Sequence, residues 1–242
     1  MTNEEKIQKL NEIVKGSDNI VFFGGAGVST ESGIPDFRSQ DGLYHQQYDY
    51  PPEEILSHTF YETMPEEFFR FYKNKILLPG ANAKPNAAHK KLAQWEQEGK
   101  LKAVITQNID GLHQAAGSKN VLELHGSVLR NYCMRCGKFY GLDAIMNADG
   151  VPKCECGGTI KPDVVLYGEN LDNDVINGAC AAISQADMLI IGGTSLNVYP
   201  AAGLVDLYRG NRLVLVNLSA TPQDSRADLV IHEKIGKVFS EL

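Results

Sequence analysis

The sequence lacks the features that are typical of secreted, membrane-spanning and nucleic-acid-binding proteins. None of its apolar runs approaches the roughly 20 residues that a transmembrane helix needs, and its charged N-terminus is not a signal peptide. Lysine and arginine number 23 against 30 aspartates and glutamates, so the net charge of −7 provides little attraction for nucleic acid. We therefore expect a cytoplasmic protein with neither nucleic-acid nor membrane partners. The sequence does not determine the oligomeric state, for which a monomer is the default expectation.

Cysteine is also scarce, with five residues in the chain, but four of them lie in one short window. Two residues separate Cys133 from Cys136, and the pair Cys154 and Cys156 follows after seventeen more. Two close pairs of thiolates are typical of a tetrahedral zinc site, whereas unligated thiols would leave the clustering unexplained. We predict one structural zinc ion, because four cysteine ligands leave no open position for water. The short spacing of the second pair requires a tighter turn, which the two glycines after it would allow.

The remaining composition is that of an ordinary globular protein, with 43% hydrophobic and 22% charged residues. Apolar stretches of strand length alternate with segments of helical periodicity. This alternation indicates a Rossmann-like α/β fold, in which a parallel sheet is covered by helices on both faces. The expected helices cover residues 4–15, 85–99, 172–184 and 200–209, and the expected strands cover 20–24, 101–106, 121–124, 187–195, 212–217 and 229–231.

Two segments do not fit this alternation. Residues 39–83 are rich in aromatic side chains and interrupted by prolines, which predicts loops and short helices. Their rings either line a cavity or pack in a core. We predict a Rossmann-like domain over residues 1–38, 84–125 and 162–242, and a small zinc-binding and helical domain over 39–83 and 126–161.

Residues 20–38 begin as a strand and enter a turn that contains Gly24, Gly25 and Gly27. A helix that starts after such a turn could direct its N–H groups at a phosphate. The spacing differs from the G-x-G-x-x-G pattern of dinucleotide sites, and the glycines could equally serve a tightly packed turn. Both interpretations are open on these residues alone.

Polar residues recur just after the predicted strands, at 107–110, His125, Thr194, Ser195 and Asn217. The carboxyl ends of parallel strands meet at one edge, where ligands bind in open α/β sheets. Dehydrogenases hold the ribose with an acidic residue at the end of the second strand, roughly 20 positions past the glycines. This chain instead enters a loop region at 42–52, so Asn217 is the better candidate for a ribose or adenine contact. His125 is a candidate general base, because an imidazole with a pKa near ~6.5 suits that work.

Two other histidines accompany predicted helices. His89 follows a helix start at Pro85 and Asn86, and we expect it to pack or to cap the helix. His113 lies on the helix after residue 110, where we expect a surface or packing role. Neither is a candidate for catalysis.

Together these segments resemble the sirtuins, a family of NAD-dependent protein lysine deacylases that includes bacterial deacetylases. The resemblance runs in order over residues 18–236 and is carried by 25–38, 107–110, 124–126, the four cysteines, 193–195 and Asn217. It implies that the acyl oxygen of a substrate lysine displaces nicotinamide from NAD, which is consumed. The products would be the free lysine, nicotinamide and an O-acyl-ADP-ribose.

The resemblance also implies which residues act. His125 would be the general base on the ribose hydroxyls. Asn108 would help to orient the ribose, and Asp110 would hydrogen-bond the nicotinamide carboxamide or stabilise the developing positive charge. Acetyl-lysine-containing proteins would be the partners, bound through backbone pairing with Val164, Val165, Leu166, Tyr167 and Gly168. NAD would contact Gly25, Ala26, Gly27, Thr30, Phe37, Arg38, Gln107, Asn108, Ile109, Asp110, His125, Gly193, Thr194, Ser195, Asn217 and Ile235.

The acyl preference is predicted from the aromatic segment. Sirtuins that prefer succinyl-lysine carry a tyrosine there and, three residues later, an arginine that binds the acid. Phe69 and Tyr72 are aligned with those two positions, so we predict an apolar acyl pocket and a preference for acetyl over succinyl. Arg70 is expected to point elsewhere.

Two other functions compete with deacetylation. An ADP-ribosyltransferase would use the same NAD pocket with a protein nucleophile, and it would yield labelled protein instead of O-acetyl-ADP-ribose. A zinc-ribbon module that binds nucleic acid or protein is disfavoured, because few basic residues lie near the cysteines and the net charge is −7.

Overall fold

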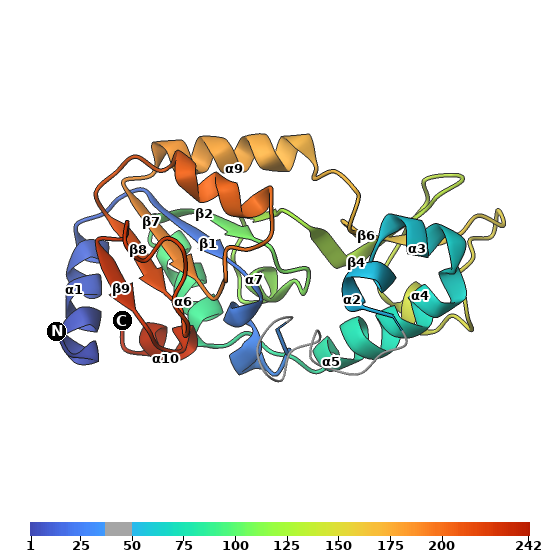
Figure 1. Cartoon of the computed structure of the whole chain (residues 1–242), viewed down its shortest axis with the longest axis horizontal. Helices are drawn as coiled ribbons and strands as arrows, with labels where there is room; N and C mark the ends of the chain where they lie inside the picture. Colours follow the sequence, from blue (N-terminus) through green and yellow to red (C-terminus); the bar gives the residue numbers. More distant parts are fainter. Residues whose placement is uncertain (37–49) are drawn as a thin grey trace.

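The main sheet has six parallel strands in the order β3-β2-β1-β7-β8-β9. The computed structural model describes residues 1–36 and 50–242 (Figure 1). Every residue of the strands β1 and β7 is buried, as expected of a sheet covered on both faces. The strands are β1 Ile20–Gly24, β2 Leu101–Thr106, β3 Val121–Glu123, β7 Met188–Gly192, β8 Leu213–Val216 and β9 Leu229–Ile231.

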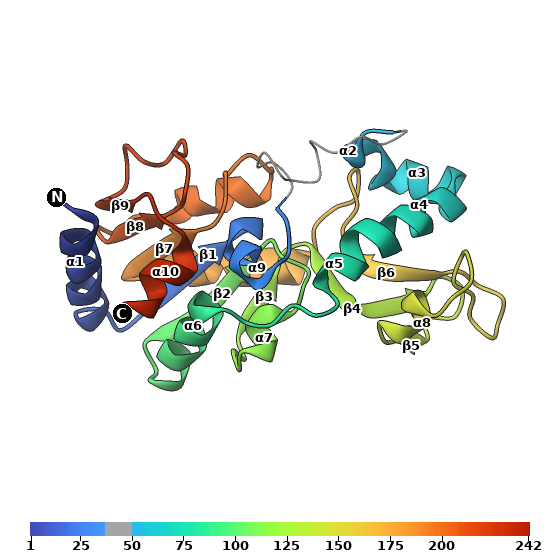
Figure 2. The ribbon, with the colours of Figure 1, turned by 90° about the horizontal axis from the view of Figure 1, so that it is seen from below.

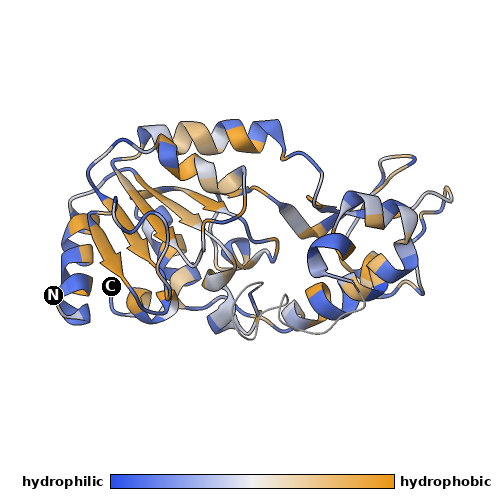
Figure 3. Cartoon of the chain, viewed as in Figure 1, coloured by the Kyte–Doolittle hydropathy of each residue, from blue (hydrophilic) through white to orange (hydrophobic). Residues whose placement is uncertain are grey.

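Helices cover both faces of this sheet and enclose two separate cores. Phe22 points into the core under α1 Asn3–Lys15, α6 Ala87–Gln97 and α10 Ile235–Ser240. Phe23, the next residue, points into the core under α9 Asn173–Gln185 and the 3₁₀ helix η5 Ala201–Leu207. The strands are mostly apolar, whereas the covering helices carry apolar and polar faces (Figure 3). The predicted Rossmann-like architecture is confirmed.

The long helices begin at residues whose side chains satisfy free backbone N–H groups. Thr2 caps α1 and forms a capping box with Glu5. Asn86 caps α6, and Asp172 caps α9 by accepting from two backbone N–H groups. No helix within residues 1–36 and 50–242 is long and apolar enough to cross a membrane.

A second, smaller group of elements lies beyond the β3 end of the main sheet (Figures 1 and 2). Its antiparallel sheet has the order β5-β4-β6, and its helical part packs on that sheet around a third hydrophobic core. The division into two domains at the predicted residues stays a prediction. The elements are β4 Gly126–Cys133, β5 Phe139–Tyr140, β6 Ile160–Val164, α2 Pro52–Ile55, α3 His58–Thr63, α4 Pro65–Phe71, the π-helix η4 Tyr72–Leu77, α5 Leu78–Gly80 and α8 Asp143–Met146.

The prediction of a helix directly after the glycine turn is wrong. The chain forms two 3₁₀ turns instead, η1 Ala26–Val28 and η2 Thr30–Ser32. Gly33 then takes a left-handed conformation with φ +88°, and Pro35 disfavours a helical conformation at the residue before it. These two residues end the helical conformation, so no α-helix forms between the glycine turn and Pro35.

Candidate active site

The predicted polar residues gather along the carboxyl edge of the main sheet. The chain leaves β1 toward β2 and β3 on one side, and it later returns on the other side through β7, β8 and β9 (Figure 1). Connections therefore diverge around β1 and β7, which is where open α/β sheets bind ligands. Along this edge the strand order places the following residues in sequence: His125, Gln107, Gly25, Thr194 and Asn217.

The loops after β1 and β7 are bonded directly to each other. The N–H of Gly27 donates to the carbonyl of Gly193 at 2.8 Å, and the N–H of Gly25 donates to Gly192 at 3.3 Å. A Cβ atom on Gly193 would lie 2.4 Å from the backbone nitrogen of Val28. The packing interpretation of these glycines is therefore correct. The N–H groups of Gly25 and Gly27 are already hydrogen-bonded within the chain. A nucleotide would therefore contact these two glycines at their Cα atoms and would not accept hydrogen bonds from their N–H groups.

Three side chains form a hydrogen-bonded network that connects this turn to the loop after β2. Ser29 Oγ donates to Asp110 Oδ2 at 2.6 Å, and Asn108 Nδ2 donates to Ser29 Oγ at 3.1 Å. The second carboxylate oxygen of Asp110 accepts from the N–H of Leu112, the first residue of α7 Leu112–Ala115. Asn108 and Asp110 are thus held in fixed orientations. Ser29, which is 1% exposed, was missed from the sequence, although it lies within the glycine segment.

His125 follows β3 and lies where the two sheets meet. Its Nδ1 is 3.0 Å from the carbonyl oxygen of Gln107, and a carbonyl can only accept. Nδ1 therefore carries the proton in the neutral ring, and Nε2 presents a free lone pair. Burial lowers the pKa of His125, although the hydrogen bond to Gln107 opposes this effect. The ring is thus kept neutral and able to take up a proton at neutral pH.

The other side of the edge is formed by the loops after β7 and β8. Gln107 Nε2 donates to Thr194 Oγ1 at 3.1 Å and so joins the two sides of β1. Asn217 Nδ2 donates to the carbonyl of Ser219 at 2.7 Å, and Ser195 is exposed. Ile235 is 3% exposed and packs in the core behind the edge.

Some predicted cofactor residues contribute differently or cannot be located. Thr30 Oγ1 donates to the carbonyl of Gly27 at 3.0 Å, which stabilises the turn. Ala26 begins the first 3₁₀ turn and is partly exposed. Phe37 and Arg38 lie outside the described residues.

His89 and His113 form a buried pair behind Asp110, with ring centroids 4.7 Å apart. Their exposures are 0% and 1%, so the surface alternative for His113 is wrong and the packing alternative holds. His89 Nδ1 accepts from the N–H of Asn86, which confirms the predicted capping role. Burial lowers the pKa of His89 to about 4, and burial together with His89 lowers the pKa of His113 to about 3.

Of the predicted substrate residues, Val165 contacts His125 directly, through its N–H and the His125 carbonyl at 3.0 Å. Phe69 and Tyr72 are 0% and 1% exposed and belong to the third core, with Val164 and Leu166. Ile109 packs against this core from the main-sheet side. Residues 165–168 do not form a regular strand edge, since only Tyr167 makes an isolated bridge.

Arg70, the basic residue nearest to these aromatic rings in the sequence, turns away from them. Its side chain is 64% exposed and pairs with Glu67 on the same helix. The prediction that Arg70 points elsewhere is confirmed. No charge from Arg70 reaches the core formed around Phe69.

The four clustered cysteines converge at the far end of the small sheet. Their sulfur atoms all lie within 4.8 Å of one another. Cys133 Sγ is 3.4 Å from Cys156 Sγ, and Cys136 Sγ is 3.7 Å from Cys154 Sγ. Zinc–sulfur bonds of about 2.3 Å in a tetrahedron put the sulfurs about 3.8 Å apart, so the cysteines fit a zinc ion.

Backbone turns hold each cysteine pair. The N–H of Cys133 donates to Lys138, and the N–H of Cys154 donates to Gly158 at 2.8 Å. A Cβ atom on Gly158 would lie 2.6 Å from Cys133 Sγ, so this position has no room for a side chain. The tight second turn predicted from the one-residue spacing is confirmed.

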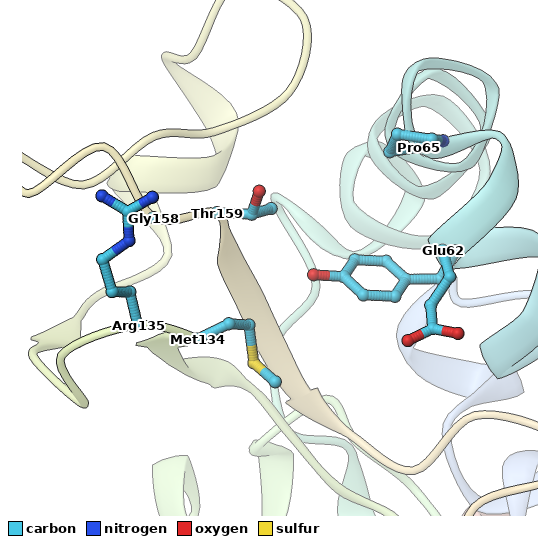
Figure 4. A pocket seen from close by; sticks show the side chains of 7 residues that line it. Glu62, Pro65, Met134, Arg135, Gly158 and Thr159 are labelled. Carbon is cyan, nitrogen blue, oxygen red and sulfur yellow. The ribbon is translucent and has the colours of Figure 1, made fainter.

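A pocket of about 410 Å³ lies between α3, α4 and the cysteine turns (Figure 4). None of its lining residues belongs to the glycine turn or to the carboxyl edge of the main sheet, so the pocket is separate from the candidate site. The lining residues are Tyr61, Glu62, Pro65, Met134, Arg135, Gly158 and Thr159.

Comparisons with known proteins agree with this geometry. The sequence model of the Sir2 family matches residues 25–200. The chain is 63% identical over 243 residues to an "NAD-dependent protein deacetylase" of Clostridium perfringens, which covers 99% of both chains. It is 54% identical over 235 residues to a protein of the same name from Cutibacterium acnes, covering 96% of both.

Solved structures give the same result. A Sir2 structure with a deacetylated p53 peptide and 3′-O-acetyl ADP ribose matches with a TM-score of 0.89 and 41% identity, covering 97% of this chain and 96% of that chain. A Sir2 structure with a p53 peptide and NAD⁺ matches with a TM-score of 0.86 and 42% identity at the same coverage. A resemblance of this extent, in sequence and in structure, spans both sheets and the edge between them. The chain therefore belongs to the Sir2 family.

Proposed function

We propose that the chain is an NAD-dependent protein lysine deacetylase. It removes acetyl groups from lysine side chains and releases nicotinamide and O-acetyl-ADP-ribose. The relatives at 63% and 54% identity bear the deacetylase name, and structural neighbours contain acetylated peptide, NAD⁺ or acetyl ADP ribose. NAD is consumed as a co-substrate.

The observation that carries this proposal is the state of His125. Its Nδ1 proton is engaged by Gln107 at 3.0 Å, and burial lowers its pKa, so Nε2 is an unprotonated base at neutral pH. We propose that Nε2 accepts a proton from a ribose hydroxyl, so that the oxygen can react with the acyl group. Gln107 would hold the ring in the orientation and tautomer that this transfer requires.

Asn108 and Asp110 are proposed to orient the reacting ribose and nicotinamide. Both are fixed through Ser29, at 3.1 and 2.6 Å, so neither needs to be ordered when the substrate binds. The edge toward Thr194 and Asn217 is proposed to hold the adenosine. The cofactor contacts predicted for the glycine turn, for Ile109 and for Ile235 stay proposals with them.

The four cysteines would hold a structural zinc ion. Their thiolates use all four tetrahedral positions, so the ion supplies folding energy to the small sheet and takes no part in the reaction. Acetyl-lysine-containing proteins are the proposed partners. Cytoplasmic localisation, a monomeric state and the two-domain division remain predictions.

Replacement of the base tests the proposal. In His125→Ala, kcat/KM for an acetyl-lysine peptide should fall by about 100-fold or more, while the far-UV spectrum and Tm stay near those of the wild type. His125→Gln keeps most of the side-chain volume and should lose activity equally. Turnover within about tenfold of the wild type in both variants would contradict the base assignment.

The competing ADP-ribosyltransferase function is separated by its product. Mass spectrometry of the wild-type reaction should detect O-acetyl-ADP-ribose in amounts equal to the deacetylated peptide. ADP-ribose attached to protein, without that product, would favour the alternative.

The acyl preference follows from the apolar surroundings of Phe69 and Tyr72. Both are buried among apolar side chains, and Arg70 is paired with Glu67 at the surface. The guanidinium of Arg70 is therefore not beside these rings to bind a succinyl carboxylate. We expect kcat/KM for an acetyl peptide to exceed that for the matched succinyl peptide by about tenfold or more. Faster desuccinylation would contradict this expectation.

A further inference from the structure

The segment proposed to pair with the substrate, residues 164–168, is tied to its surroundings by its own backbone. The N–H of Val165 donates to the carbonyl of His125 at 3.0 Å, so the segment starts at the proposed base. Tyr167 exchanges two bonds with the junction of α2 and α3: its N–H donates to Leu56 at 3.0 Å, and its carbonyl accepts from His58 at 2.9 Å. The segment thus connects the base to the helical part.

The side chain of Glu169 closes this segment into a turn. One carboxylate oxygen, Oε2, accepts from the N–H of Leu166 at 2.8 Å and from Lys161 Nζ at 3.1 Å. The other, Oε1, lies 2.8 Å from His58 Nδ1. In addition, the N–H of Glu169 donates to the carbonyl of Leu166 at 2.9 Å. One residue therefore engages both backbone groups of Leu166 and joins β6 to α3.

This junction is a charged group in a largely enclosed place. The side chains of Glu169 and Lys161 are 20% and 13% exposed. Burial opposes ionisation of Glu169, but the N–H of Leu166 and the contacts with His58 and Lys161 outweigh it and lower the pKa of the carboxyl group. Lys161 Nζ also donates to the carbonyl of Val164 at 3.1 Å, so its ammonium bridges the carboxylate and the start of the segment.

These bonds determine which backbone groups a peptide could use. Both backbone groups of Leu166 and of Tyr167 are engaged within the chain, as is the N–H of Val165. Among the described residues, the carbonyl of Val165 and the N–H of Gly168 have no intrachain partner. Gly168, with φ +89°, reverses the chain at this point. The orientation of these two groups therefore depends on the turn that Glu169 closes.

We propose that Glu169 is a positioning residue for the peptide substrate. Its carboxylate holds residues 165–168 in the one conformation that directs the Val165 carbonyl and the Gly168 N–H toward an extended acetyl-lysine peptide. This inference rests on the proposed deacetylase function and extends it. Glu169 itself contacts neither NAD nor the acetyl group.

The test is steady-state kinetics of Glu169→Gln in the full-length protein with zinc present. The amide keeps the size of the side chain but removes the charge that Lys161 and His58 engage. We expect KM for an acetyl-lysine peptide to rise about tenfold, with kcat and KM for NAD within about twofold of the wild type. A residue that only stabilised the fold would change all three parameters together, along with Tm.

A second, milder variant keeps the inference testable if Glu169→Gln does not fold. Among the contacts of Glu169, His58→Ala removes only the one to Oε1, at a side chain that is 43% exposed, and it should raise KM for the peptide about threefold. The matched control is Glu62→Gln, because Glu62 contacts His58 Nε2 at 3.3 Å from the solvent side and does not touch residues 164–169. Its kinetic constants should equal those of the wild type.

The outcomes separate the two levels of inference. If the wild type deacetylates the peptide and both variants keep the wild-type KM for it, Glu169 is not a positioning residue. If the wild type neither binds a fluorescent acetyl-lysine peptide nor deacetylates it, the proposed function fails and this inference fails with it. A peptide-specific rise in KM in both variants, with the control unchanged, supports the inference.

Discussion

At the scale of single residues, the buried pair of His89 and His113 is an unusual feature for a protein core. Within the described residues, Nε2 of His89 and both ring nitrogens of His113 have no hydrogen-bond partner. Phe22 packs on the other side of His113, with ring centroids 6.1 Å apart. A protonated imidazole at this buried place would have no acceptor for its added proton, so the folded chain favours the neutral form of both rings.

This pair predicts a loss of stability in mild acid. In the unfolded chain both histidines take up protons below about pH 6.5, whereas in the folded chain their pKa values are about 4 and about 3. Stability is therefore fully present above about pH 6.5 and is lost as the pH falls from there toward about 4. Each histidine contributes a slope of about 1.4 kcal/mol per pH unit in that range.

Urea unfolding at pH 7 and pH 5 measures the effect. The wild type should lose about 2 kcal/mol more than His113→Leu between these two values, since the variant lacks one of the two titrating rings. His232→Gln changes a largely exposed histidine and serves as the control. Equal losses in the wild type and in His113→Leu would contradict the prediction.

The positions of single residues in the fold were easier to predict from the sequence than their surroundings. His125 and Asn217 lie at the sheet edge as expected, because each follows a predicted strand, and the four cysteines converge as their spacing indicates. Ser29 was missed, since its partners Asn108 and Asp110 lie 79 and 81 residues away in the chain. His113 lies on a helix of four residues, which is too short for a periodic pattern to indicate burial.

At the scale of elements, the connection from β3 to β4 joins the two sheets beside His125. Gly126 has φ +75°, and a Cβ atom there would lie 1.9 Å from the carbonyl oxygen of Asp163. Arg130 pairs with Glu123 at 2.6 Å and with Asp163 at 2.7 Å, so one guanidinium bridges β3, β4 and β6. The position of His125 therefore depends on the close contact between the antiparallel strands β4 and β6.

The metal centre gives a prediction about the small sheet. Cys133→Ser should lose zinc and unfold the elements around β4 and β6, because metal binding and folding are linked there. The single tryptophan, Trp95, packs in the main-sheet core, so its emission should change little. Zinc content by a colorimetric chelator and limited proteolysis within residues 126–166 measure both effects.

Cys180 provides the matched control for this experiment. It is a free cysteine outside the metal cluster, so Cys180→Ser should keep one zinc per chain. A Cys133→Ser protein that remained resistant to protease and fully active would contradict a structural role for the metal.

Element prediction succeeded where one pattern dominates and failed where patterns compete. The central strands were found because they are continuous apolar runs, such as β7. β4 was not predicted, because Arg130 and Asn131 interrupt its apolar character. The helix expected after the glycine turn failed because Gly33 and Pro35 end it within two short turns.

At the scale of the whole molecule, the parallel sheet and its two covering layers were predictable from the alternation of strands and helices. The placement of the small sheet against the β3 end was not, because it depends on contacts between distant segments (Figure 2). The arrangement puts the proposed base between the main sheet, which would hold NAD, and residues 164–168, which would hold the peptide. Cleavage of NAD should therefore depend on the presence of the acetylated peptide.

One measurement tests this central claim most directly: nicotinamide release from NAD by the wild-type protein, with an acetyl-lysine peptide, with the unacetylated peptide and with no peptide. In the proposed reaction the acyl oxygen of the acetyl-lysine is the nucleophile that displaces nicotinamide, so cleavage of NAD requires the acetylated peptide. We predict release with the acetylated peptide only, in amounts equal to the deacetylated product. Equal nicotinamide release in all three reactions, or none in any, would contradict the account.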